Sequence, residues 1–165
     1  MNRAATCATI AAALILSGCA GNRPGDEAAP TPTQATVEQF ASVVARNEQP
    51  IRSIAEDRSD CYLDIILRDR ETLAQSCIDA AAEGRFALIV IKDEFGELGD
   101  PPAEIDELVQ RLTRGGQHMA DTPELDVRAN CGDAQSDECA ETVASVMESL
   151  KQAIVPELDA WKPYL

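Results

Sequence analysis

The residues best suited to chemistry in this chain are its six cysteines, because a thiol can be alkylated, oxidised to a disulfide or bound to a metal. Cys7 and Cys19 lie near the amino terminus, and the other four occupy positions 61, 77, 131 and 139. Neither pair of successive cysteines among these four forms a Cys-x-x-Cys motif, the spacing that favours a reactive thiol. We therefore expect structural disulfides from them rather than a redox centre.

Cys19 stands at the end of an uncharged segment. Arg3 supplies one positive charge, and residues 4–16 form a stretch of 13 residues without any charge. That stretch is too short for a permanent transmembrane helix but has the length of the apolar region of a signal peptide. It runs into the sequence Leu16-Ser17-Gly18-Cys19. This sequence resembles the lipobox of bacterial lipoproteins, in which an aliphatic residue and two small residues precede a cysteine. Cys7, inside the apolar stretch, is expected to act only as a small apolar residue.

The lipobox resemblance concerns residues 1–19 and implies a defined chemistry for Cys19. Its thiol would become a thioether to diacylglycerol, and the chain would be cleaved between Gly18 and Cys19. The acyl chains on Cys19 would then bind the mature protein to a membrane. An ordinary secretory leader with a chance cysteine is the alternative. Position 20 is Ala rather than the Asp that favours inner-membrane retention in enterobacterial-type lipoproteins. The resemblance therefore implies the cell envelope, with the outer membrane facing the periplasm favoured where the organism has two membranes.

An exported chain with four remaining cysteines is expected to form two disulfides, for which three connectivities exist. Cys131 and Cys139 are close along the chain and could pair locally. On one continuous helix, Cys61 and Cys77 would lie about 24 Å apart and could not bond. They can meet if the chain turns back near Asp69, and we predict this hairpin with the pairs Cys61–Cys77 and Cys131–Cys139. Pairings that join the first hairpin to the later loop remain the alternative.

Other titratable residues provide weaker candidates for a site. His118 is the only histidine, and it follows Gly115 and Gly116 in an expected exposed turn, without a recognisable nucleophile motif. Two acidic clusters lack the spacing of a calcium loop and are expected to be solvated faces. Trp161 is expected to pack the terminal segment against the domain rather than to stack on a sugar. We therefore nominate no catalytic residue, no metal ligand and no cofactor, and we expect a protein that is not an enzyme. The acidic residues of the two clusters are Asp93, Glu94, Glu97 and Asp100, and then Asp133, Asp137, Glu138 and Glu141.

Net charge excludes nucleic acid as a partner, and composition divides the chain into three segments. The formal net charge is −15, and such a surface repels the phosphate backbone, so nucleic acid is excluded as a partner. We expect a signal peptide over residues 1–18, a lipidated cysteine and disordered linker over 19–36, and a helical domain over 37–165. The linker is rich in proline, glycine and small polar residues that leave nothing to bury.

Apolar residues after position 36 recur at helical spacing and predict three or four helices. Pro50 is expected to kink or restart the first helix, and residues 86–91 are predicted to be helical rather than a buried strand. The next helix should end at Gly115 and Gly116, residues 121–137 should be polar and irregular, and a last helix should cover about 138–150, with Pro156 near its end. The residues expected to face inward are Val37, Phe40, Val44, Ile51 and Ile54; Leu73, Cys77, Ala80, Gly84, Leu88, Ile91, Phe95 and Leu98; Ile105, Leu108, Val109 and Leu112; and Val143, Val146, Met147, Leu150 and Ile154.

These patterns predict an all-α fold, a small antiparallel helical bundle of three or four helices cross-linked by two disulfides. The predicted function is that of an exported, lipid-anchored envelope protein. Its bundle would act as a non-enzymatic interaction or accessory module with an envelope protein as partner. The alternative is a carrier of a small apolar ligand or lipid, with the aliphatic run 88–91 lining a cavity between helices.

Overall fold

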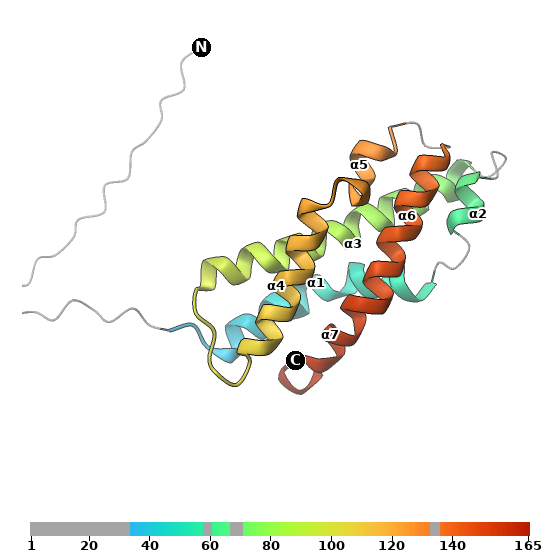
Figure 1. Cartoon of the computed structure of the whole chain (residues 1–165). Coiled ribbons are helices and arrows are strands. Elements are labelled where there is room, and N and C mark those ends of the chain that lie inside the picture. Colours follow the sequence, from blue (N-terminus) through green and yellow to red (C-terminus); the bar gives the residue numbers. More distant parts are fainter. Residues whose placement is uncertain (1–33, 58–60, 67–70, 133–135) are drawn as a thin grey trace, which may run out of the picture. The chain divides into compact units, whose positions relative to one another are not determined.

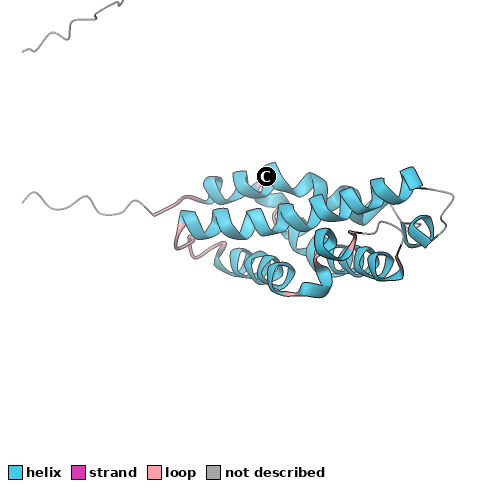
Figure 2. Cartoon of the chain, turned by 90° about the horizontal axis from the view of Figure 1, so that it is seen from above, coloured by secondary structure: helices cyan, strands magenta, loops and turns pink. Residues whose placement is uncertain are grey.

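The computed structural model describes residues 34–57, 61–66, 71–132 and 136–165, and within them it is all-α, with no strand (Figures 1 and 2). The expected helical bundle with two disulfides is confirmed. Its long central helix α3 packs against α1 and α4, while α6 packs against α2 and α5. The helices are α1 (Val37–Asp57), α2 (Cys61–Ile66), α3 (Glu71–Leu98), α4 (Asp106–Asp121), α5 (Val127–Asn130), α6 (Asp137–Ser149) and α7 (Val155–Ala160).

Helix α1 begins with a side-chain cap from Gln39 and continues past its proline. The amide of Thr36 donates to the side-chain oxygen of Gln39 at 2.8 Å, which satisfies a donor that the helix start would leave free. The helix does not restart at Pro50, one of the two expected outcomes, since it is continuous from Val37 to Asp57. Gly84 of α3 provides the space beside this proline, because a Cβ atom there would lie 3.4 Å from the Pro50 carbonyl oxygen.

Helix α3 buries a regular stripe, but its first residues differ from the expectation. Leu73 is 50% exposed, and Ala80 is half-buried, whereas the neighbouring Ala74 and Ala81 are fully buried. Residues on the buried side of a packed helix recur at alternating steps of three and four positions. The buried residues of α3 keep this alternation when Ala74 and Ala81 replace Leu73 and Ala80. The correct inward stripe is Ala74, Cys77, Ala81, Gly84, Leu88, Ile91 and Phe95.

Helix α4 continues beyond the two glycines that were expected to end it, and reaches Asp121. The glycines instead allow a close crossing. A Cβ atom on Gly116 would lie 2.8 Å from the Leu88 backbone oxygen of α3, and one on Gly115 would lie 2.5 Å from Ile154 Cδ1. Only a residue without a side chain fits at such a crossing. The glycines are therefore packing residues inside a helix.

The segment between α4 and α6 is more regular than expected. It contains a short 3₁₀ turn, Pro123–Leu125, followed by α5, and it buries Leu125 and Val127 in the core. Helix α6 begins at the Ser136 hydroxyl, which accepts a hydrogen bond from the Cys139 amide at 3.1 Å.

The last helix is longer than expected. From α6 the chain passes through a π-helical turn, Leu150–Ile154, directly into α7, which ends at Ala160 rather than near position 150. Pro156 lies in the first turn of α7, where its missing amide donor is tolerated. The wider turn before it keeps Leu150 and Ile154 buried on the same side as the α6 stripe.

An aromatic cluster fixes the carboxyl-terminal segment to the bundle. The ring of Trp161 lies 5.7 Å from that of Phe95, which in turn lies 5.3 Å from Phe40 of α1. Tyr164 packs against the outer side of Trp161 with a centroid distance of 6.1 Å. Trp161 is fully buried, so it serves as a core residue, as expected, and offers no exposed face to a sugar.

Candidate functional site

The predicted lipidation and cleavage residues, Cys19 and Gly18, lie outside the described residues, as do most of the predicted linker and the expected bend near Asp69. Only residues 34–36 of the linker are described, and they precede α1 without helical structure. No helix in the described ranges is both long enough and apolar enough to span a membrane. The anchor at Cys19 therefore stays a prediction from the sequence.

Both predicted disulfide pairs are present. Cys61 at the start of α2 is bonded to Cys77 of α3, with their Cα atoms 5.6 Å apart. Cys131, directly after α5, is bonded to Cys139 in the first turn of α6, with a Cα separation of 4.6 Å. Cys61, Cys77 and Cys139 are buried. These bonds connect packed helices inside the domain, which is the arrangement of structural cross-links.

His118 lies in the last turn of α4 and is exposed. Its Nδ1 atom lies 3.2 Å from the Thr122 hydroxyl, four residues further along the chain. No carboxylate of the described residues is hydrogen-bonded to the ring to orient it as a general base. Nothing in this surrounding gives His118 a catalytic geometry, and its lack of a catalytic role stays a prediction.

The two acidic clusters differ in their contacts. Glu94 forms an ion pair with Arg46 of α1, and Asp93 pairs with Lys92 at 2.7 Å. Asp133 lies outside the described residues, whereas Asp137 and Glu138 occupy the first turn of α6, where negative charge is favourable. Among the described residues, no three His, Cys, Asp or Glu side chains are grouped so that they could hold a metal ion.

A groove between α3 and α5 is a candidate binding surface. A hollow of about 350 Å³ and a smaller one of about 60 Å³ share Ala82, Val127 and Arg128 in their walls. On α3, Ile78, Ala82 and Phe86 follow one another at intervals of four residues and form one wall. We call this feature the α3–α5 groove.

Phe86 and Val127 give the groove its apolar character. Phe86 is 58% exposed, more than any other large hydrophobic residue of the described ranges, while Val127 and Ile78 are buried at the base. The sequence analysis places Phe86 in the apolar run 86–91 and does not identify it as a surface residue. Phe86 falls between Gly84 and Leu88 of the buried stripe, so helical spacing places it on another face of α3. That spacing was the signal that could have identified it as exposed.

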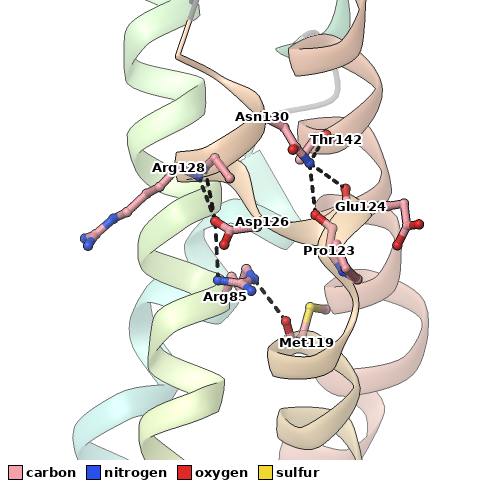
Figure 3. A network of polar contacts seen from close by, with 9 residues as sticks. Arg85, Met119, Pro123, Glu124, Asp126, Arg128, Asn130 and Thr142 are labelled. Carbon is pink, nitrogen blue, oxygen red and sulfur yellow. Dashed lines mark hydrogen bonds and ion pairs between the residues drawn. The ribbon is translucent and has the colours of Figure 1, made fainter.

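A polar network holds α5 in place beside the groove (Figure 3). The Asp126 carboxylate caps α5 by accepting from the Arg128 and Ala129 amides, both at 3.2 Å. Arg85 of α3 lies 3.9 Å from that carboxylate and donates to the Met119 carbonyl at 3.1 Å. The network thus connects α3, the end of α4 and α5.

Asn130 completes the network on its other side. Its amide nitrogen donates to the Pro123 carbonyl at 3.1 Å and lies 3.2 Å from the Thr142 hydroxyl of α6 (Figure 3). The Arg128 side chain, by contrast, points away from Asp126, and its guanidinium forms no ion pair within the described parts of the chain. Arg128 is therefore an exposed cation of the groove wall.

Acidic residues border the groove along α3. Asp79 and Glu83 are exposed, lie four residues apart and contribute to the larger hollow. The Asp79 carboxylate accepts a hydrogen bond from the Gln75 amide at 2.8 Å. The groove thus combines an apolar centre with Asp79, Glu83 and the Asp126-paired Arg85 on the α3 side, and Arg128 on the α5 side.

The chain was compared with protein families, curated proteins and solved structures. No family model, no curated protein and no solved structure matches the chain.

Proposed function

We propose that this protein is an exported lipoprotein of the cell envelope whose helical domain is a non-enzymatic interaction or accessory module. The observation that carries the proposal is Leu16-Ser17-Gly18-Cys19 at the end of an uncharged stretch of 13 residues. Acyl chains stabilise membrane binding by about 0.8 kcal/mol per buried methylene, so two or three chains on Cys19 would form a stable anchor. Position 20 favours the outer membrane, facing the periplasm, in an organism with two membranes.

The disulfides support export. Structural disulfides form and persist in oxidising compartments and are rare in the cytosol. Each cross-link of this domain joins segments that are close along the chain and buried in the packed bundle, with sequence separations of 16 and 8 residues. A domain that relies on two such bonds is suited to the periplasm or the cell surface.

The packing of the aliphatic run favours an interaction module over a carrier of an apolar ligand. A carrier needs a cavity between helices, and residues 88–91 were the segment expected to line one. Leu88 and Ile91 are fully buried, and the Gly115–Gly116 segment of α4 crosses α3 directly over Leu88. This crossing fills the space that a ligand would occupy.

The proposal is tested by replacing Cys19 with serine in cells that express the full chain and by comparing the membrane and soluble fractions. Cys7→Ser is the matched control, because it removes an equal thiol from within the apolar stretch. We expect the wild type and Cys7→Ser to be recovered from membranes at the mature size. Cys19→Ser should be recovered as the longer precursor or in the soluble fraction. Recovery of Cys19→Ser from membranes at the mature size would contradict the proposal.

A further inference from the structure

We propose that the α3–α5 groove is the docking site for a cationic, amphipathic helix of a partner protein. The proposal rests on the function proposed above in one respect only, since it takes the domain to be an interaction module. It assigns the surface that is used and the chemistry of the partner, and the variants that test it leave the predicted lipidation residue Cys19 unchanged.

Phe86 provides the main apolar contact of the groove. More than half of its ring is exposed, so a partner that covers the ring would gain hydrophobic free energy of binding. Phe86, Ala82 and Ile78 form a line over eight residues of α3, which is about 12 Å long at 1.5 Å per residue. A partner helix of about two turns covers that length and can place an apolar side chain between Phe86 and Val127.

The charge of the domain selects the kind of partner. Residues 1–33 contain two cations and two anions, so the whole formal charge of −15 belongs to the part of the chain that follows them. A second copy of the domain and an anionic lipid surface would both be repelled. A basic segment would be attracted, and Asp79 and Glu83 lie beside the apolar line at a spacing that suits successive turns of a cationic helix.

Arg128 sharpens the assignment because it lies on the opposite wall with its side chain directed away from Asp126. A cationic helix must place its basic residues beside Asp79 and Glu83, away from this guanidinium. Arg85, the other cation of the lining, already faces Asp126 and donates to the Met119 carbonyl. Reversal of the Arg128 charge should therefore strengthen binding, whereas reversal of the Glu83 charge should weaken it. General attraction to an anionic protein would change binding in the same two directions, so a matched charge change outside the groove is the control that separates the two explanations.

The test uses the full mature protein in nanodiscs of zwitterionic lipid and a labelled helical peptide of leucine and lysine, with binding followed by fluorescence anisotropy. Empty nanodiscs provide the background, and a leucine–glutamate peptide is the charge control. We expect Phe86→Ser to weaken binding about tenfold and Glu83→Lys about fivefold. Arg128→Glu should strengthen it about threefold. All three side chains are exposed, and circular dichroism would verify that each variant is folded.

Two matched variants test whether these effects belong to the groove itself. Glu104→Lys makes the same charge change at an exposed position outside the groove, and Leu73→Ser removes an exposed apolar side chain elsewhere on α3. Both should bind within twofold of the wild type. The proposal is overturned if Glu104→Lys weakens binding as much as Glu83→Lys does, or if Phe86→Ser binds like the wild type. Equal binding of the glutamate peptide would overturn the assigned partner charge. A failure of this test would leave the Cys19 fractionation result unchanged.

Discussion

A Cβ atom on Gly116 of α4 would lie 2.8 Å from the Leu88 backbone oxygen of α3 and 2.6 Å from Lys92 Cβ. Real side chains do not approach a backbone oxygen so closely, and a backbone atom cannot move aside as a flexible side chain can. The crossing of the central helix and α4 therefore depends on the absence of a single methyl group.

Gly116→Ala is expected to destabilise the domain even though alanine is the better helix former. The added methyl group must push α3 and α4 apart, and overpacking of this kind costs about 1–3 kcal/mol. Urea denaturation followed by circular dichroism measures the loss as a lower transition midpoint. Gly96→Ala is the matched control, because a Cβ atom at this exposed position of α3 meets nothing within 4 Å. It should stabilise the domain by about 0.5–1 kcal/mol. Equal stability of the two variants would show that the crossing is not tight.

The two glycines also show what the sequence could not predict. Adjacent glycines after an apolar stripe are a common signal of a helix end, so position 115 was a reasonable boundary. The same residue type is required where two helices cross closely, and that requirement comes from α3, which is distant along the chain. Local sequence cannot distinguish the two cases.

Other features were predictable because local information determines them. The stripes through Phe40, Leu88 and Val143 identified helices that bury these residues completely. The two local disulfide pairs were the predicted choice, because Cys61 and Cys77 can meet if the chain reverses between them, while pairings to the later loop stayed open. The shift from Leu73 to Ala74 was missed because size and hydrophobicity favoured the leucine, whereas the regular alternation favoured the alanine.

The candidate groove was less accessible to sequence reasoning. Phe86 lies in an apolar run, and hydrophobicity alone predicts that it is buried, yet more than half of it is exposed. Arg128 lies in a segment that was expected to be irregular, and its position opposite α3 follows from the capping of α5 by Asp126. Residues brought together by such tertiary packing leave no pattern of spacing in the sequence.

Trp161→Ala should destabilise the domain by about 3–5 kcal/mol, because the fully buried ring joins the end of the chain to Phe95. Trp161→Phe should cost much less. The buried indole nitrogen has no hydrogen-bond acceptor among the described residues, so phenylalanine removes an unsatisfied donor as well as some packing. Thermal denaturation followed by circular dichroism compares the two variants. If they prove equally unstable, the ring does not act through its apolar packing.

Removal of either disulfide should lower stability, with a slightly larger effect for the longer loop. The double variant Cys61→Ala/Cys77→Ala opens a loop of 16 residues, and Cys131→Ala/Cys139→Ala opens one of 8. Chain entropy predicts losses of about 3 and about 2.5 kcal/mol. Urea denaturation of both variants measures these values, and peptide mapping without reductant checks the pairing in the wild type. A peptide that links Cys61 to Cys131 or Cys139 would contradict the fold.

Asp159 is expected to contribute to the loss of stability in acid. Hydrogen bonds from Arg52 and then from Lys162 hold the pKa of its carboxyl below the ordinary value. The stabilisation is complete above the pKa of the unfolded chain, about 3.9, and is lost as the pH falls through the lower folded pKa. A carbon NMR titration of this carboxyl checks the direction, and Arg52→Gln should raise its pKa. Titration at the ordinary value in the wild type would disagree with the geometry.

The central claim is a lipid-modified Cys19, and mass spectrometry of the amino-terminal peptide tests it most directly. The protein would be extracted from membranes with detergent, digested and analysed without prior removal of lipid. We predict a first peptide that begins with Cys19 and carries the mass of a diacylglyceryl group, with or without an additional acyl chain on the amine. A membrane-extracted protein whose first peptide contains an unmodified Cys19, or begins after that residue, would contradict the account.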